Sequence, residues 1–311
     1  MATTIQAALI TTYGTPPTYT TVPLPSPTPS QIQLKVLATG LHNLVRSRAS
    51  GTHYTSPPLP QIPGVDGIGL ATDGKKYYFT SLATGGTFAN HINVDLSALT
   101  PLPPNADPTQ TAALVNPATS SWMAIKARAA NLPKPFNALI LGATSASGRL
   151  ATPLARSLGA GKIFGAARDA SALSSLPMDG ALIVPAHDAS ETDFAPLAGM
   201  QIDLVLDYVN GDLPAAFLSK HEQTAPMQYV HIGTLSEKEM ALPGRVLRSK
   251  DLTIRGSGPG AWSLKELKGE MPALLEALGG VEEQRVRVVG LQDVEGEWGR
   301  RGEGERVVFV P

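Results

Sequence analysis

One run of the chain joins an apolar strand pattern, a glycine-containing turn and an amphipathic helix pattern: NALILGATSASGRLATPLARSLGAGKIFGAARDAS, residues 137–171. The turn carries Gly142 and Gly148, and an apolar KIFGAA segment follows the helix pattern. A strand, a helix and a second strand in this order form a βαβ unit with parallel strands. The N-terminus of its helix presents free backbone N–H groups that bind a pyrophosphate. The run therefore predicts a dinucleotide-binding turn.

Serine stands at position 145, where the glycine fingerprint of such turns has its middle glycine. Its side chain is small, and its hydroxyl can donate to a phosphate oxygen, so we interpret Ser145 as a tolerated variant. A strand-to-helix turn without a ligand is the alternative, because a lone glycine motif is weak evidence. The residues expected to contact the cofactor here are Gly142, Thr144, Ser145, Ala146, Ser147 and Gly148.

The second strand of this unit ends in Arg168 and Asp169. A carboxylate about 20 residues after the glycines accepts the ribose hydroxyls of NAD, whereas a guanidinium suits the 2′-phosphate of NADP. We place Arg168 at this position and predict NADPH as the cofactor. Asp169, one residue on, leaves NADH open, and a solvated Arg–Asp pair is the alternative without a ligand.

Apolar segments alternate with alanine- and leucine-rich stretches from about residue 113 to 260, which is typical of an α/β fold with a doubly wound parallel (Rossmann) sheet. The flanking sequence is different: residues 1–112 are rich in proline and threonine with short alternating runs, and two more apolar runs follow at 286–291 and 306–310. We expect a dinucleotide-binding domain at 113–269 and a β-rich domain formed by 1–112 and 270–311.

Composition excludes several classes of function. A net charge of −1 over 311 residues, without a basic cluster, does not predict the positively charged surface that binds nucleic acid. No apolar run approaches the ~20 residues of a membrane span, and the N-terminus lacks the pattern of a signal peptide, so we expect a cytoplasmic protein. The chain has no cysteine, which excludes disulfides, thiol nucleophiles and thiolate zinc ligands.

The order of these segments resembles the medium-chain dehydrogenase/reductase superfamily over nearly the whole chain. The segments GVDGIG (64–69), GGTFANHI (85–92) and NPATSSWMAI (116–125) are similar to its zinc-independent quinone oxidoreductase and enoyl reductase branch. The resemblance implies a GroES-like β-barrel for the first domain, with substrate bound near it, and a homodimer. It implies hydride transfer from NADPH to a quinone or an α,β-unsaturated carbonyl.

Zinc-dependent members of the superfamily carry a Gly-His-Glu run. At the corresponding positions this chain has Gly64, Val65 and Asp66. With imidazole and thiolate ligands both missing, we expect no metal and no Lewis-acid chemistry. Alcohol dehydrogenation is therefore the weaker hypothesis.

The resemblance also implies which residues line the site. Tyr208 is the leading candidate to bond the substrate oxygen, and packing beside the cofactor is its alternative role. Asn116 and Thr119 are further catalytic candidates, unless they cap a helix that starts near Ser120. Asp207, Tyr208, Gly233, Thr234 and Ser257 are expected at the cofactor, and His42, Tyr54, Asn116 and Trp262 in the substrate pocket. The alternatives are a structural histidine in a turn for His42, which we favour, and core packing for Trp262.

Two classes of function remain open: a reductase, in detoxification or as a tailoring enzyme of secondary metabolism, or a cofactor-binding redox sensor without turnover.

Overall fold

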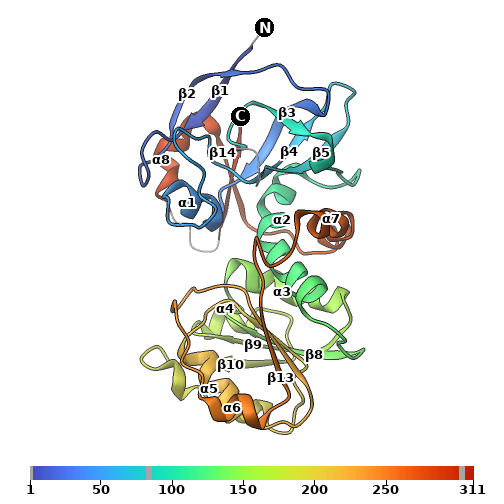
Figure 1. Cartoon of the computed structure of the whole chain (residues 1–311). Helices are drawn as coiled ribbons and strands as arrows, with labels where there is room; N and C mark the ends of the chain where they lie inside the picture. Colours follow the sequence, from blue (N-terminus) through green and yellow to red (C-terminus); the bar gives the residue numbers. More distant parts are fainter. Residues whose placement is uncertain (1–2, 82–85, 301–304) are drawn as a thin grey trace. The chain divides into compact units, whose positions relative to one another are not determined.

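The computed structural model describes residues 3–81, 86–300 and 305–311, which form two compact units (Figure 1). Unit 1 comprises Met1–Asn116 and Met271–Pro311, and unit 2 comprises Pro117–Glu270. Gly85, the first residue of the GGTFANHI segment, lies outside the described residues.

Unit 2 is built on six parallel strands in the order β10, β9, β8, β11, β12, β13. The strands are β8 (Phe136–Leu141), β9 (Ala160–Ala167), β10 (Gly180–Ile183), β11 (Leu204–Asp207), β12 (Met227–His231) and β13 (Leu252–Gly256). The chain starts in the middle with β8, runs outward to β10, and returns to β11 on the other side of β8. The predicted parallel α/β sheet is thus confirmed, and its direction of winding reverses between β8 and β11, where doubly wound folds bind ligands.

Helices cover both faces of this sheet, which is why its strands are apolar on both sides. They are α3 (Ala146–Ser157), α4 (Ala170–Ser174), α5 (Asp212–Lys220) and α6 (Gly244–Ser249). On one face Phe217 of α5 and Val246 of α6 are buried against the sheet. On the other face Ala151 of α3 and Leu173 of α4 are buried.

Unit 1 contains a two-stranded antiparallel sheet, β1 (Thr3–Leu9) with β2 (Thr18–Leu24), and a larger sheet in the order β14, β15, β3, β4, β5, β7, with β6 paired to β3. The strands of the larger sheet are β3 (Gln31–Gly40), β4 (Asp66–Leu70), β5 (Lys76–Thr80), β6 (His91–Asp95), β7 (Leu99–Pro101), β14 (Val286–Gly290) and β15 (Arg306–Val310). Its short helices are α1 (Asn43–Ala49) and α8 (Val294–Trp298). The C-terminal strands join this sheet because β15 pairs with β3.

The boundaries between the units fall inside two helices, α2 (Pro108–Met123) and α7 (Leu264–Leu278). Each contains an internal proline, Pro117 in α2 and Pro272 in α7. The sequence placed a helix start near Ser120, but α2 begins at Pro108 and continues into a π-helical turn, Ala124–Arg128. Asn116 and Thr119 therefore lie inside the helix and do not cap it.

Among the described residues, no helix has the length and hydropathy needed to span a membrane.

Candidate functional site

The turn between β8 and α3 depends on glycine at two positions. Gly142 has a φ of +86°, and a Cβ there would lie 2.8 Å from Val209 Cγ1. A Cβ on Gly148 would lie 2.3 Å from the carbonyl oxygen of Gly142. Both positions therefore require glycine, the first for its conformation and the second because α3 lies so close to the turn.

Ser145 is the N-cap of α3. Its backbone is extended, and its Oγ accepts a hydrogen bond from the backbone N–H of Gly148 at 3.1 Å. A hydroxyl that accepts one hydrogen bond still has its own hydrogen to donate. Serine at this position therefore stabilises the helix start and adds a donor to the backbone N–H groups of the first turn.

A cavity of about 830 Å³ opens beside this turn at the carboxyl edge of the sheet. It is lined by Gly142, Thr144 and Ser145 from the turn, by Ala166–Arg168 after β9, by residues 184–190 after β10, and by Val209, Asp212, Leu213, Leu235, Ser236 and Glu237. Part of the predicted cofactor set, namely the glycine turn and Arg168, thus lines one cavity.

The structure separates the roles of Arg168 and Asp169. Arg168 is exposed and lines the cavity. Asp169 is the N-cap of α4, where its Oδ1 accepts from the backbone N–H of Ala172 at 2.9 Å. The Asp169 carboxylate thus has a structural role at the start of α4, and Arg168 is the charged residue of this strand end that lines the cavity.

Tyr208 follows β11 and is buried, with its hydroxyl 2.6 Å from Ser121 Oγ in α2. Ser121 in turn donates to the carbonyl of Ser147, at the start of α3, at 3.3 Å. Burial raises the pKa of the Tyr208 phenol well above its usual value. The hydroxyl therefore joins α2 to the glycine turn, and its proton is held more tightly than that of a free tyrosine.

Asp207 is the last residue of β11 and is fully buried. Its Oδ1 accepts from the backbone N–H groups of Val209 and Asn210, at 2.9 and 3.0 Å. Its Oδ2 accepts the hydroxyl of Tyr229 and faces His231 Nδ1 at 3.4 Å. The sequence analysis did not single out His231. A signal was present, because His231 ends one predicted apolar strand just as Asp207 ends the strand before it.

The other residues predicted at the cofactor also follow strands of unit 2. Gly233 donates its N–H to the carbonyl of Asp207 at 3.1 Å, and Thr234 is exposed. Ser257 follows β13, donates its N–H to the carbonyl of His231 at 2.8 Å, and has a buried Oγ without a partner among the described residues. Ala146 and Ser147 are the first residues of α3. Trp262, in the loop after β13, is buried, as is Thr119 in α2.

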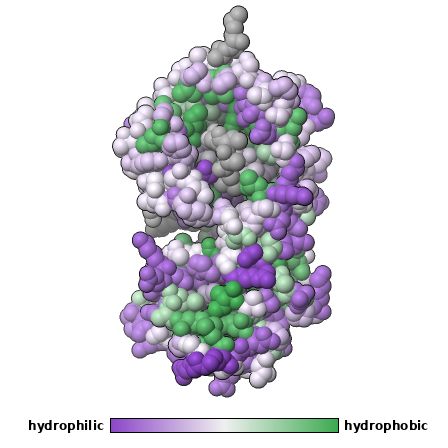
Figure 2. All heavy atoms as spheres, in the orientation of Figure 1, coloured by the Kyte–Doolittle hydropathy of each residue, from purple (hydrophilic) through white to green (hydrophobic). Residues whose placement is uncertain are grey.

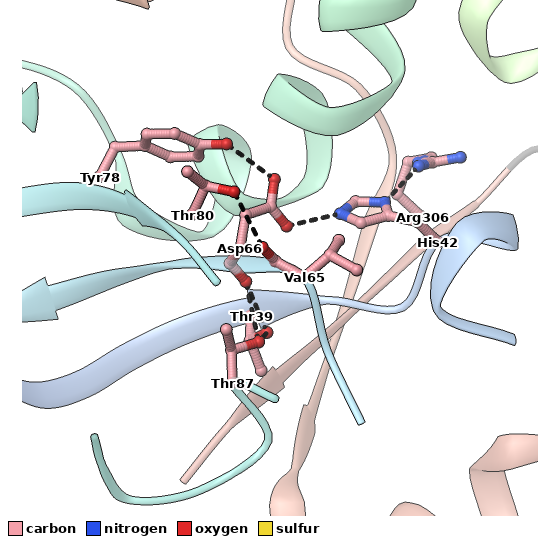
Figure 3. Close-up of polar contacts among 8 residues, drawn as sticks. All are labelled: Thr39, His42, Val65, Asp66, Tyr78, Thr80, Thr87 and Arg306. Carbon is pink, nitrogen blue, oxygen red and sulfur yellow. Dashed lines mark hydrogen bonds and ion pairs between the residues drawn. The ribbon is translucent and has the colours of Figure 1, made fainter. Parts of the chain in front are cut away.

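Three of the predicted substrate-pocket residues belong to unit 1. Tyr54 is 74% exposed and its ring stacks on His53 at 4.2 Å. Asn116 is half-buried in α2. His42 is 2% exposed and lies in a polar cluster with Asp66, Tyr78 and Arg306 (Figure 3).

In this cluster the Arg306 guanidinium donates to His42 Nδ1 at 2.8 Å. The imidazole therefore carries its hydrogen on Nε2, which faces Asp66 Oδ1 at 3.4 Å, and the Tyr78 hydroxyl donates to Asp66 Oδ2 at 3.1 Å. Burial, opposed by Asp66 and assisted by Arg306, lowers the pKa of His42. The side chain is thus a neutral bridge between a cation and an anion, with both ring nitrogens directed at protein groups.

The described residues contain no group of three or more histidine, cysteine, aspartate or glutamate side chains that could hold a metal ion. At the position of the Gly-His-Glu run, Val65 contributes an alkyl side chain, and Asp66 is directed at His42 and Tyr78. The donor set here does not fit a tetrahedral zinc site.

The sequence was compared with known proteins. It is 35% identical to a probable NADPH-dependent quinone reductase, TdiC, of Emericella nidulans, over 99% of this chain and all of that protein. No model of a protein family matches the chain.

The fold was compared with solved structures. A quinone oxidoreductase of Thermus thermophilus, solved alone and with NADPH, is 24% identical with a TM-score of 0.75 over 98% of this chain and all of that one. A quinone oxidoreductase of Pseudomonas syringae pv. tomato is 21% identical with a TM-score of 0.79, and each chain is covered completely. These similarities show a shared fold.

Proposed function

The chain belongs to the quinone oxidoreductase branch of the medium-chain dehydrogenase/reductase superfamily, and from this we propose that it is an NADPH-dependent, zinc-independent oxidoreductase that reduces a quinone or an α,β-unsaturated carbonyl. The relative in Emericella nidulans is named for NADPH and quinone, and the Thermus structure was determined with NADPH. The proposal extends both properties to this protein.

The observation that carries the proposal is the fit of the cavity to a dinucleotide phosphate. The turn that lines this cavity needs glycine at positions 142 and 148, since Gly142 has a positive φ and a Cβ at position 148 would collide with the Gly142 carbonyl. Backbone N–H groups and the Ser145 hydroxyl can hold the pyrophosphate, and Arg168 in the same cavity can pair with a 2′-phosphate. These residues fit NADPH, which when bound supplies the hydride.

The protein's own contribution is to bind, orient and exclude water. Arg168 and the turn fix one end of the cofactor, and the dipole of α3 favours the pyrophosphate charge. Tyr208 and Ser121 hold α2 against the turn. We propose that unit 1 is a GroES-like substrate domain whose His42, Tyr54 and Asn116 contribute to the substrate pocket, as the family resemblance implies.

We also propose a homodimer, formed through the free edge of β13. This strand ends the six-stranded sheet, and Ile254 on it is 41% exposed. On the face of the molecule drawn in Figure 2, hydrophobic side chains gather in a patch on unit 2. A sedimentation experiment that finds only a monomer would contradict the dimer without affecting the proposed activity.

The test of function is calorimetric titration of the metal-stripped protein with NADPH and with NADH, followed by NADPH oxidation over a panel of quinones and enones. We expect NADPH to bind more tightly than NADH and at least one acceptor to be reduced. Binding without turnover over a broad panel would favour a sensor, and no binding would refute the role of the glycine turn.

A further inference from the structure

The reduction of a quinone or an enone consumes a proton as well as a hydride, and Tyr208 is a poor source for it. Its hydroxyl is buried, paired with Ser121 Oγ, and has a raised pKa. A proton donor is therefore expected among the other titratable groups at the carboxyl edge of the sheet in unit 2.

His231 is such a group, because it is the last residue of β12 and lies opposite Asp207, the last residue of β11. Its side chain is 36% exposed, whereas that of Asp207 is fully buried. A carboxylate only accepts hydrogen bonds, so the Nδ1 that faces Asp207 Oδ2 carries the hydrogen. The other nitrogen, Nε2, has no hydrogen-bond partner among the described residues and is free to donate or accept.

Asp207 is held in a fixed position. Two backbone N–H groups bond its Oδ1, and the Tyr229 hydroxyl bonds its Oδ2. One of these N–H groups belongs to Asn210, which adopts a left-handed conformation with a φ of 62°. A buried carboxylate fixed by several donors orients an imidazole, as in other carboxylate–histidine pairs.

In the order of the sheet, His231 would lie toward the reacting end of a cofactor bound with its adenosine half in the cavity. The cavity beside the glycine turn extends over the ends of β9 and β10, where Arg168 would bind the adenosine half. The other half must then run from β8 across β11 and β12. At a strand spacing of about 4.8 Å, β12 lies roughly 10 Å from β8, which is within reach of a nicotinamide mononucleotide half.

We propose that His231, oriented by Asp207, is the catalytic proton donor of the reduction, an assignment that rests on the proposed function. The acceptor takes an electron pair as hydride from the cofactor and becomes an anion. The bond between Nε2 and its hydrogen then breaks, and a new O–H or C–H bond forms on the acceptor. His231 becomes neutral and is protonated again from solvent, so that NADPH, acceptor and one proton give NADP⁺ and the reduced acceptor.

The test uses His231→Gln and His231→Ala in the full chain, with NADPH and phenanthrenequinone as the acceptor. Glutamine can still donate to Asp207 but cannot deliver a proton. We expect kcat to fall about 100-fold in both variants, with NADPH affinity within about twofold of the parent. Added imidazole is expected to restore part of the activity of His231→Ala, which loss of a merely structural side chain would not allow. His91→Gln, on β6 of unit 1, is the matched control and is expected to keep its kcat.

Each result has one interpretation. If the parent binds NADPH and reduces the quinone, but His231→Gln keeps a kcat within about threefold of the parent, solvent or another group supplies the proton and the assignment is wrong. If His231→Ala is inactive and imidazole does not restore it, His231 does not donate the proton. If the parent itself does not bind NADPH or reduce any acceptor, the proposed function fails, and this inference fails with it.

Discussion

At the scale of single residues, Ser145 shows how one side chain serves both the fold and the proposed ligand site. Its departure from the glycine fingerprint could be recognised in the sequence, and so could the capacity of a hydroxyl to donate to phosphate. The hydrogen bond from the Gly148 N–H adds that Ser145 also caps α3. Glycine has no side chain to accept this hydrogen bond, so serine stabilises the start of α3 more than the glycine of the usual fingerprint would.

Two substitutions separate these roles. Ser145→Ala is expected to lower the free energy of unfolding by about 1 kcal/mol and Ser145→Gly by a few tenths of that, because glycine at an N-cap leaves the N–H groups open to water. Urea unfolding followed by circular dichroism measures both. An unchanged free energy of unfolding in Ser145→Ala would show that the cap seen at 3.1 Å contributes no stability.

Arg168 carries the preference for NADPH over NADH in our proposal. The sequence left Arg168 and Asp169 as competing candidates because the end of a strand cannot be assigned to one residue from a pattern. The hydrogen bond between Asp169 and Ala172 gives this carboxylate a capping role, which favours Arg168 for the 2′-phosphate in our proposal.

Arg168→Ala is expected to weaken NADPH binding by about 10- to 100-fold, the value of a charge-assisted hydrogen bond, and NADH binding by less than about threefold. Calorimetric titration with both nucleotides is the measurement, and Lys162→Ala, near the other end of β9, is the control for the loss of a positive charge. An equal loss of affinity for both nucleotides would show that Arg168 does not contact the 2′-phosphate.

At the scale of elements, the strands of the parallel sheet followed from the sequence and the start of α2 did not. A short apolar run between turn residues is compatible with few secondary structures, and a buried strand is the main one. Helix α2 is different, because its Asn116-Pro117 pair suggests a break, and proline removes the N–H that would bond to the carbonyl of Ala113. Helix α2 nevertheless continues through Pro117, and buried neighbours such as Val115 and Ala118 keep it packed. Tertiary packing therefore outweighs the local signal there.

The contact between α2 and β11 depends on the Ser121–Tyr208 pair. Ser121→Ala leaves the Tyr208 hydroxyl buried without this partner, so we expect a loss of about 1–3 kcal/mol in the free energy of unfolding. Tyr208→Phe is expected to cost less, about 0.5–1.5 kcal/mol, because Ser121 can still donate to the Ser147 carbonyl.

A double-mutant cycle on urea unfolding measures the coupling between Ser121 and Tyr208. The double variant should be no less stable than Ser121→Ala alone, since removing both polar groups leaves none unpaired. Strict additivity of the two losses would show that the hydroxyls do not interact. The same Tyr208→Phe protein also tests the catalytic role predicted from the family, because a structural hydroxyl would leave the quinone kcat nearly unchanged.

At the scale of the whole molecule, the cluster in Figure 3 ties the two ends of the chain into one unit. Arg306 and His42 are 264 positions apart, and Asp66 and Tyr78 come from two further strands. The sequence predicted that the last strands return to the first domain, from their β-like composition alone. It could not predict the pairing of His42 with Arg306, because a single sequence contains no signal for contacts over that distance. The same cluster gives the buried His42 two charged neighbours, Arg306 and Asp66, within unit 1.

The cluster makes the stability of the protein depend on pH. Because burial lowers the pKa of His42 in the folded state, the unfolded chain binds a proton more readily than the folded chain below the ordinary histidine pKa of about 6.5. The contribution of neutral His42 to the free energy of unfolding is therefore fully present above about pH 6.5. It is lost as the pH falls from about 6.5 through the pKa of His42 in the folded state. His53 and His221, whose pKa values are also lowered by burial, act in the same direction.

His42→Gln isolates the contribution of His42, since glutamine does not titrate and can donate its amide hydrogens to Asp66. We expect the variant to be less stable than the parent above about pH 6.5, because its amide cannot reproduce both contacts of the ring, and to lose less stability on acidification. Urea unfolding at several pH values on both sides of the histidine pKa gives this difference, with His91→Gln as the control from the same unit. A parallel pH dependence in parent and variant would mean that the pKa of His42 is the same in the folded and the unfolded chain. The imidazole would then not be the neutral bridge that joins the last strand of the chain to the first sheet.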